Sequence, residues 1–161
     1  METHHTNGKQ NEQMHYKKFV WMIAISFAAM YILMYAMVDT FANVLLNVNQ
    51  IYMASLMTAA MILIEMLVMG GMYKNRKYNV IIISFGAILL VVSFFAIRFQ
   101  TAVSDRQFLK SMVPHHAAAI LMVKETKIQD PEIQKLAEEI ISSQQKEIDF
   151  MKSKLEEIDN K

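Results

Sequence analysis

The sequence contains no cysteine among its 161 residues, and it has only four glycines and two prolines. Without cysteine it can form no disulfide framework, no thiolate zinc site and no thiol nucleophile. Because glycine and proline are the main breakers of regular structure, their scarcity favours long helices over short strands and turns. The sequence also has no large excess of positive or negative residues. The formal net charge is +1, which argues against a nucleic-acid partner.

Apolar residues are abundant, at 54% of the chain, and they concentrate in three long runs. These runs cover residues 19–38, 51–72 and 80–97, and each is long enough to cross a bilayer as a helix, which takes roughly 20 residues. Glu65 is the one ionisable residue deep within a run. An intramembrane carboxylate is a candidate polar site. The alternative is a protonated side chain that hydrogen-bonds to a neighbouring helix.

Lysine and arginine indicate how the runs are oriented. The basic residues around the first two runs are Lys9, Lys17, Lys18, Lys74, Arg76 and Lys77. The loop at residues 39–50 has none. Because cytoplasmic segments carry the excess of basic residues, we expect residues 1–18 to form a cytoplasmic polar tail. Residues 98–161 then lie outside the cytoplasmic membrane, in the periplasm or the extracellular space, after a transmembrane region at 19–97.

The extracytoplasmic tail is predicted to fold as two helices, at residues 104–127 and 131–158. Ser104 and Gln107 have the spacing of a capping box, and Asp130 precedes a proline suited to a first helical position. The fold class is therefore all-α, with three transmembrane helices followed by a helical hairpin. Two helices bury little core alone, so we expect the hairpin to dimerise into a four-helix bundle or to pack on the outer ends of the spans.

On each predicted tail helix, residues at helical spacing form one face, a stripe that contains both apolar and polar side chains. In the first helix the stripe is Asp105, Phe108, Met112, His115, Ala119 and Met122, with His116 at its edge. In the second it is Ile133, Leu136, Ala137, Ile140, Gln144, Glu147, Ile148, Met151 and Leu155. An antiparallel hairpin would bring Met112 and both histidines close to Gln144, Glu147 and Met151.

Thioethers and imidazoles together form a ligand set that suits a soft, late transition metal, above all Cu(I). The predicted metal ligands are Met112, His115, His116, Met122 and Met151. Buried polar side chains need partners, so Asp105, Gln144 and Glu147 are placed around these ligands. Glu147 or Asp105 would accept a hydrogen bond from the outer nitrogen of a ligating histidine. Ag(I) and Cu(II) are the alternative ions, and the alternative role for a histidine on an apolar face is structural.

The tail also resembles the DUF305 family, whose members include copper-binding, CopM-like periplasmic proteins. The matching residues are Asp105, Phe108, Met112, His115, His116, Ala119, Met122, Gln144, Glu147, Ile148 and Met151. The pattern departs at Lys154, where many members carry tryptophan. The three-run prefix is similar to that of a membrane-anchored subgroup. The resemblance implies a ferritin-like helical fold and a role in copper binding or tolerance.

We therefore predict a membrane-anchored protein that captures or buffers copper and is not an enzyme. Its predicted partners are the metal ion, membrane lipid, a second copy of the chain and a copper-handling protein. The main alternative is a structural or sensory membrane protein whose hairpin mediates oligomerisation. A di-iron enzyme is disfavoured because the tail lacks a Glu-x-x-His motif, and a zinc hydrolase because no metallohydrolase motif is present. A transporter would need more spans than one chain provides.

Overall fold

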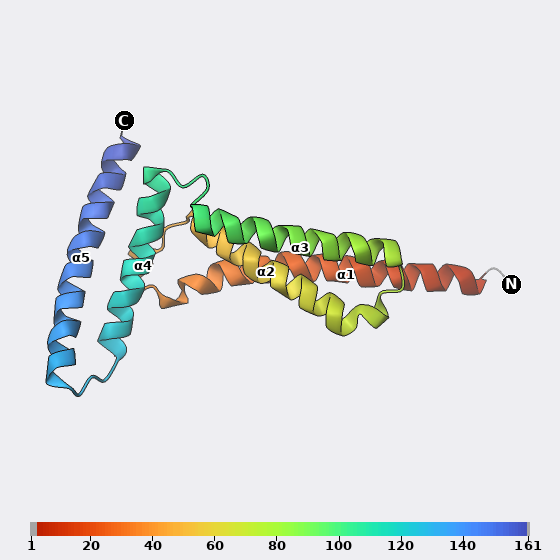
Figure 1. Cartoon of the computed structure of the whole chain (residues 1–161), viewed down its shortest axis with the longest axis horizontal. Coiled ribbons are helices and arrows are strands. Elements are labelled where there is room, and N and C mark those ends of the chain that lie inside the picture. The colour runs from red at the N-terminus through yellow and green to blue at the C-terminus, as the bar shows by residue number, and fades with distance from the viewer. Residues whose placement is uncertain (1–2, 161) are drawn as a thin grey trace. The chain divides into compact units, whose positions relative to one another are not determined.

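The computed structural model describes residues 3–160, with side chains described from Met14 onward. Its α-helices are α1 (Thr3–Leu33), α2 (Val48–Met69), α3 (Arg76–Phe99), α4 (Asp105–Glu125) and α5 (Pro131–Asp159) (Figure 1). Short 3-10 turns at Met34–Met37, Phe41–Asn43 and Gly70–Met72 lie between the helices. No strand occurs within residues 3–160. The all-α prediction is confirmed.

The chain forms two compact units that interleave along the sequence. The three-helix unit contains the chain up to Ile32 together with Ile51–Gln100. The hairpin unit contains Leu33–Gln50 together with Thr101–Lys161. The loop that follows the first apolar run thus packs with the C-terminal tail, although α2 and α3 separate the two in sequence.

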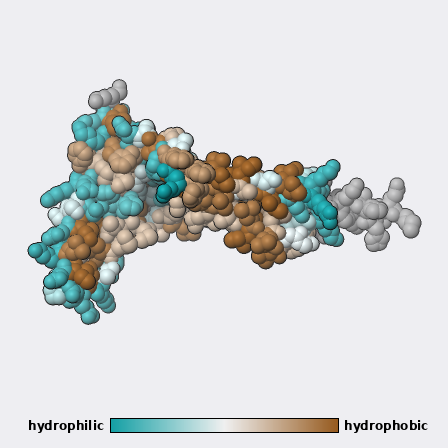
Figure 2. Space-filling view, in the orientation of Figure 1, coloured by the Kyte–Doolittle hydropathy of each residue, from teal (hydrophilic) through white to brown (hydrophobic). Residues whose placement is uncertain are grey.

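The three helices of the first unit are long and apolar enough to span a membrane, at Met14–Met37, Val48–Met72 and Arg76–Phe99. Their bounds extend a few residues beyond the apolar runs, because the helices continue into flanking polar residues. Only 6%, 28% and 17% of the three apolar windows are buried within the protein. Most of the apolar surface therefore faces outward, as the brown atoms along this unit show in Figure 2.

The interior of the three-helix unit is small. Phe19, Ile62, Met66 and Tyr73 form its buried cluster. Gly86 allows α3 to approach α2 closely, because a Cβ atom there would lie 3.0 Å from Ile62 Cγ2. Small residues at such crossings are typical of helix pairs within membranes.

In the hairpin unit, α4 and α5 run antiparallel (Figure 1). Asp130 caps α5 as predicted, since its carboxylate accepts hydrogen bonds from the backbone N–H groups of Glu132 (2.8 Å) and Ile133 (3.1 Å). The capping box predicted for α4 is wrong. Ser104 occupies the N-cap position, but its side chain makes no capping hydrogen bond.

Gln107, the other member of the expected capping box, makes a long-range contact. Its side-chain oxygen accepts a hydrogen bond from the backbone N–H of Val48, at 3.1 Å. Val48 begins α2, so its amide lacks a partner within that helix. The glutamine therefore caps the start of α2 and joins the α1–α2 loop to α4.

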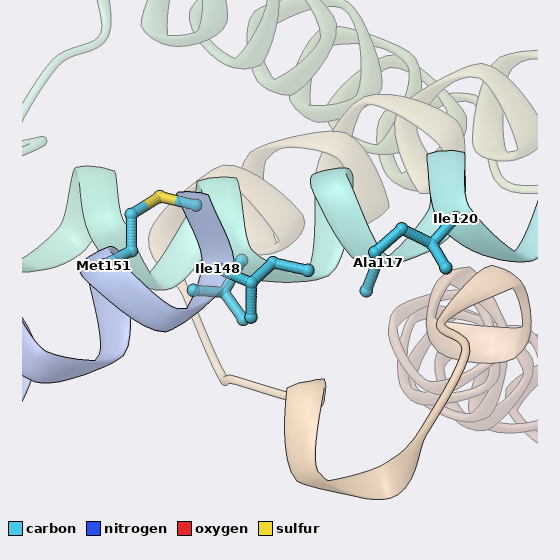
Figure 3. Close-up of a cluster of buried hydrophobic side chains, with 5 residues drawn as sticks. Ala117, Ile120, Ile148 and Met151 are labelled. Atoms are coloured by element: carbon cyan, nitrogen blue, oxygen red, sulfur yellow. The ribbon is translucent and has the colours of Figure 1, made fainter. Parts of the chain in front are cut away.

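The core of the hairpin unit lies where α4, α5 and this loop meet (Figure 3). Val113, Ala117 and Ile120 of α4 face Ile148 and Met151 of α5, and all five are buried. Four partly buried side chains pack against them, and two of these, Val38 and Leu45, belong to the loop. The loop thus supplies part of the apolar surface that two helices alone would lack.

Candidate functional site: a histidine and two methionines in the hairpin

The face of α4 that points into the core differs from the one predicted. Val113, His116, Ala117 and Ile120 are buried, whereas Asp105 and His115 are exposed, and Phe108 and Met122 are each 51% exposed. The predicted stripe and the buried stripe are neighbouring faces of α4 with the same helical spacing. The stripe that includes Val113 and Ile120 buries more aliphatic surface, and this gain determines which face of α4 is oriented toward the core.

The predicted face of α5 is closer to the observed one. Ala137, Ile148, Met151 and Leu155 are buried, and Gln144 is half-buried. The face opens toward the helix start, where Ile133 and Leu136 are 52% and 54% exposed. α4 therefore covers the first turns of α5 less completely than it covers the rest of that helix.

His116 is the polar side chain at the centre of the candidate site. It is only 8% exposed, and its Nδ1 atom lies 3.1 Å from Glu147 Oε2 on α5. The two atoms are within ion-pair distance, yet the contact lacks hydrogen-bond geometry and leaves Nδ1 without a hydrogen-bond partner. Glu147 itself remains half exposed. The antiparallel pairing predicted to bring this histidine to Glu147 is therefore observed.

The charge state of His116 follows from its surroundings. Burial lowers the pKa of the imidazole below its ordinary value of 6.5, because charging a desolvated ring is costly. The nearby Glu147 carboxylate opposes this by raising the pKa, and His115 lowers it further. Burial dominates, so the ring is neutral at pH 7. A neutral imidazole is the form that binds metals.

Two thioethers lie next to this histidine along the hairpin. Met151 is 7% exposed within the core, and Met112 is partly buried against the same core. Met112 precedes His116 by one helical turn, and Met151 follows Glu147 by one turn, so antiparallel helices bring both to the adjacent level. Figure 3 shows the Met151 side chain on α5 beside α4. Two methionines and one histidine therefore lie on adjacent turns of the two paired helices.

Three of the predicted site residues do not join this group. His115 is exposed, with its ring centroid 6.1 Å from that of His116. Met122 is exposed six residues beyond His116 on α4, and Asp105 is exposed at the start of the helix. Among residues 14–160, whose side chains are described, no three His, Asp or Glu side chains cluster in a way that could hold a metal ion. A metal site at His116 would therefore need thioether ligands.

Glu65 forms a separate polar contact in the three-helix unit. The Tyr73 hydroxyl donates to Glu65 Oε1 at 3.5 Å, and the carboxylate is half-buried. Two methionines of the same unit differ in their surroundings. Met30 Sδ accepts a hydrogen bond from the Thr58 hydroxyl at 3.7 Å, whereas Met57 is 44% exposed.

Val38 and Leu45 complete the core behind the site, and neither was predicted to belong to it. Val38 was predicted to end the first apolar run, and Leu45 to lie in the connecting loop at residues 39–50. The signal was present in its composition, since residues 44–46 are Val-Leu-Leu and the loop carries a single charge, at Asp39. An apolar loop of this kind needs a surface to cover it.

Comparison with known proteins extends these observations. The family model described as "Domain of unknown function (DUF305)" matches residues 95–155. The chain is also similar to "Uncharacterized protein L153" of Acanthamoeba polyphaga mimivirus, at 37% identity over 139 residues that cover 84% of this chain and 90% of that protein. This similarity is far longer than the hairpin, so it includes apolar helices as well. No solved structure matches the chain.

Proposed function

Since this chain belongs to the DUF305 family, we propose that it is a membrane-anchored protein whose hairpin binds copper outside the cytoplasmic membrane. Cu(I) is the favoured ion, with Ag(I) and Cu(II) as alternatives. The protein would buffer the ion or pass it to a copper-handling partner, and we assign it no catalytic activity. The ion is thus the cargo of this protein.

One observation carries the proposal, namely the buried His116 beside two thioethers. Glu147 Oε2 lies 3.1 Å from Nδ1, the ring atom that lacks a hydrogen bond. A small rotation of either side chain would let Nδ1 donate to this carboxylate, which would leave Nε2 for the metal. Met112 and Met151 would add soft sulfur donors, which favour Cu(I). We therefore assign the site to Met112, His116 and Met151.

Two sets of contacts support a three-span topology. Tyr16 lies at the start of the first span, and its hydroxyl contacts Asn75 and Asn79, which flank the start of the third. The loop after the first span shares a compact unit with the tail that follows the third. Three successive crossings put each of these pairs on one side of a bilayer. Lys17 and Arg76 lie at the Tyr16 end, which favours that end as the cytoplasmic one.

The copper site can be tested on the full-length protein in detergent by competition with a chromophoric Cu(I) chelator. Replacing both core thioethers, in Met112→Leu with Met151→Leu, should weaken Cu(I) binding by at least about tenfold, because the ion loses its soft ligands. Leucine preserves the volume and apolar character of the core, so helix content should be unchanged. His116→Gln should also weaken binding.

Matched controls exist for both changes. Met122→Leu removes an exposed thioether of the same helix, and His115→Gln removes the adjacent exposed imidazole. Neither should alter affinity by more than about twofold if the ion sits in the core. Equal affinities for the wild type and the double methionine variant would contradict the proposed site. A loss confined to His115→Gln and Met122→Leu would move the site to the surface of α4.

The alternative function is that the hairpin only mediates oligomerisation. Several large apolar side chains of the hairpin unit are about half exposed, namely Phe108, Met122, Ile133, Leu136 and Phe150. Thermal melting separates the two functions. A bound ion at one hundred times its Kd would stabilise the fold by about 2.7 kcal/mol. An oligomeric hairpin without a metal site would show a Tm that depends on protein concentration and is unaffected by copper.

A further inference from the structure

A shallow groove runs along the outside of the three-helix unit between α1 and α3. It consists of two adjoining cavities of about 270 and 210 Å³, which share Tyr16 and Val20 in their walls. The first is completed by Lys17 and Trp21 of α1. The second is completed on α3 by Tyr78, Ile81 and Ile82. Apart from Lys17 and the tyrosine hydroxyls, the walls are apolar.

Contacts at one end of the groove fix its shape. The Tyr16 hydroxyl donates to Asn79 Oδ1 at 2.8 Å and accepts from the backbone N–H of Asn75 at 3.2 Å. The Tyr16 ring also packs edge-on against Tyr78, with centroids 5.2 Å apart. These contacts join α1 to the start of α3, so the groove is held open by the fold.

The same end of the unit is basic. Lys17 lines the groove directly, and Lys18, Arg76 and Lys77 lie at the level of the Tyr16 contacts. No aspartate or glutamate occurs within residues 14–18 or 73–79. An apolar channel with a cationic mouth complements a molecule that has a hydrocarbon chain and an anionic head.

We propose that this groove binds an anionic phospholipid from the surrounding bilayer. One acyl chain lies along Val20 and Ile81, and the headgroup phosphate is held by Lys17. This inference rests on the proposed membrane location but not on the copper site. It also assigns Lys17 a role different from that of Lys18, which lies outside the groove walls.

Trp21 is the only tryptophan of the chain and lies in the wall of the groove, so its fluorescence reports on the lipid found there. The full-length protein would be reconstituted in phosphatidylcholine vesicles that contain a small fraction of one lipid with brominated acyl chains. Brominated phosphatidylglycerol should quench Trp21 more strongly than brominated phosphatidylcholine at the same fraction. The difference should correspond to an enrichment of phosphatidylglycerol next to Trp21 of about fivefold, the size expected from one lysine that contacts an anionic headgroup. The enrichment should fall as salt is added.

Two variants and a control test the geometry. Lys17→Gln should abolish the enrichment, and Val20→Phe should reduce it by filling the groove while leaving Lys17 in place. Lys18→Gln removes the same charge one residue away and should retain most of the enrichment. Equal quenching by both lipids in the wild type, or an equal loss in Lys17→Gln and Lys18→Gln, would overturn the site. Absence of quenching by either lipid would refute the membrane location as well, and the copper titration would be unaffected.

Discussion

The two units of this protein use the same secondary structure in opposite ways. In the three-helix unit the apolar side chains lie mainly outside, as Ile88 at 62% exposure illustrates. In the hairpin unit the aliphatic side chains of α4 lie inside, and Ile120 is fully buried. A helix that is apolar all round needs a lipid or protein environment. An amphipathic helix can instead bury its apolar face in a core while its polar face contacts water. The two units therefore bury their apolar side chains to very different extents, and the proposed membrane location accounts for this difference.

The largest expected effect comes from matched charge substitutions in the two units. Ile88→Asp lies near the middle of α3, and Phe150→Asp lies on α5, at similar exposures of 62% and 60%. A carboxylate at the centre of a spanning helix costs roughly 2.5–3.5 kcal/mol of insertion free energy. We expect Ile88→Asp to impair membrane insertion, measured with a glycosylation reporter.

Phe150→Asp should change hairpin stability by less than about 0.5 kcal/mol, since a surface substitution in water is tolerated. Lys154, whose ammonium lies 5.9 Å from the Phe150 ring, would then face the new carboxylate. Tolerance of aspartate at Ile88 would contradict the assignment of α3 to a bilayer. A large loss of stability at Phe150 would instead show that this face of the hairpin is covered by a partner.

The next effect concerns the loop that completes the hairpin core. Leu45 packs against this core, whereas the adjacent Leu46 is 66% exposed. Leu45→Ala should destabilise the hairpin by about 1–2 kcal/mol, and Leu46→Ala by less than about 0.5 kcal/mol. Hydrogen exchange of the α4 amides in the full-length protein would measure the difference. Equal protection in the two variants would show that the hairpin core does not depend on the loop.

The smallest effect is a pH dependence of hairpin stability. Burial lowers the pKa of His116 below 6.5, so the unfolded chain binds a proton more readily than the folded one. Stability contributed by the neutral ring is present above pH 6.5 and is lost as the pH falls toward the lowered pKa. His116→Gln should flatten this dependence in denaturation curves measured between pH 7 and pH 5. His115→Gln, at the exposed neighbour, should leave the slope as in the wild type.

Local signals in the sequence predicted much of the fold. Asp130 followed by Pro131 located the start of α5, and the apolar runs located the three long helices. The face of α4 was predicted wrongly, because the stripe was chosen for its histidine and methionines rather than for its aliphatic area. The correct stripe contains Val113 and Ile120. Where two faces have the same period, the buried aliphatic surface decides between them.

The candidate site was predicted only in part, because residue spacing does not predict contacts between distant segments. The pairing of His116 with Glu147 followed from antiparallel geometry, which residue spacing alone can supply. The contributions of Val38 and Gln107 depend on contacts between segments far apart in the chain. Periodicity describes one helix at a time, so it carries no information about which distant loop will cover a core.

The position of Val38 and Leu45 in the hairpin core has a consequence for biosynthesis. Both leave the ribosome well before the α4 side chains that pack beside them, with α2 and α3 in between. During synthesis the two loop side chains must remain uncovered until α4 arrives, since contacts between such distant segments form late. A helix translated late therefore covers a loop translated early. Ribosome stalling or premature termination before α4 would leave that loop open to proteases and chaperones.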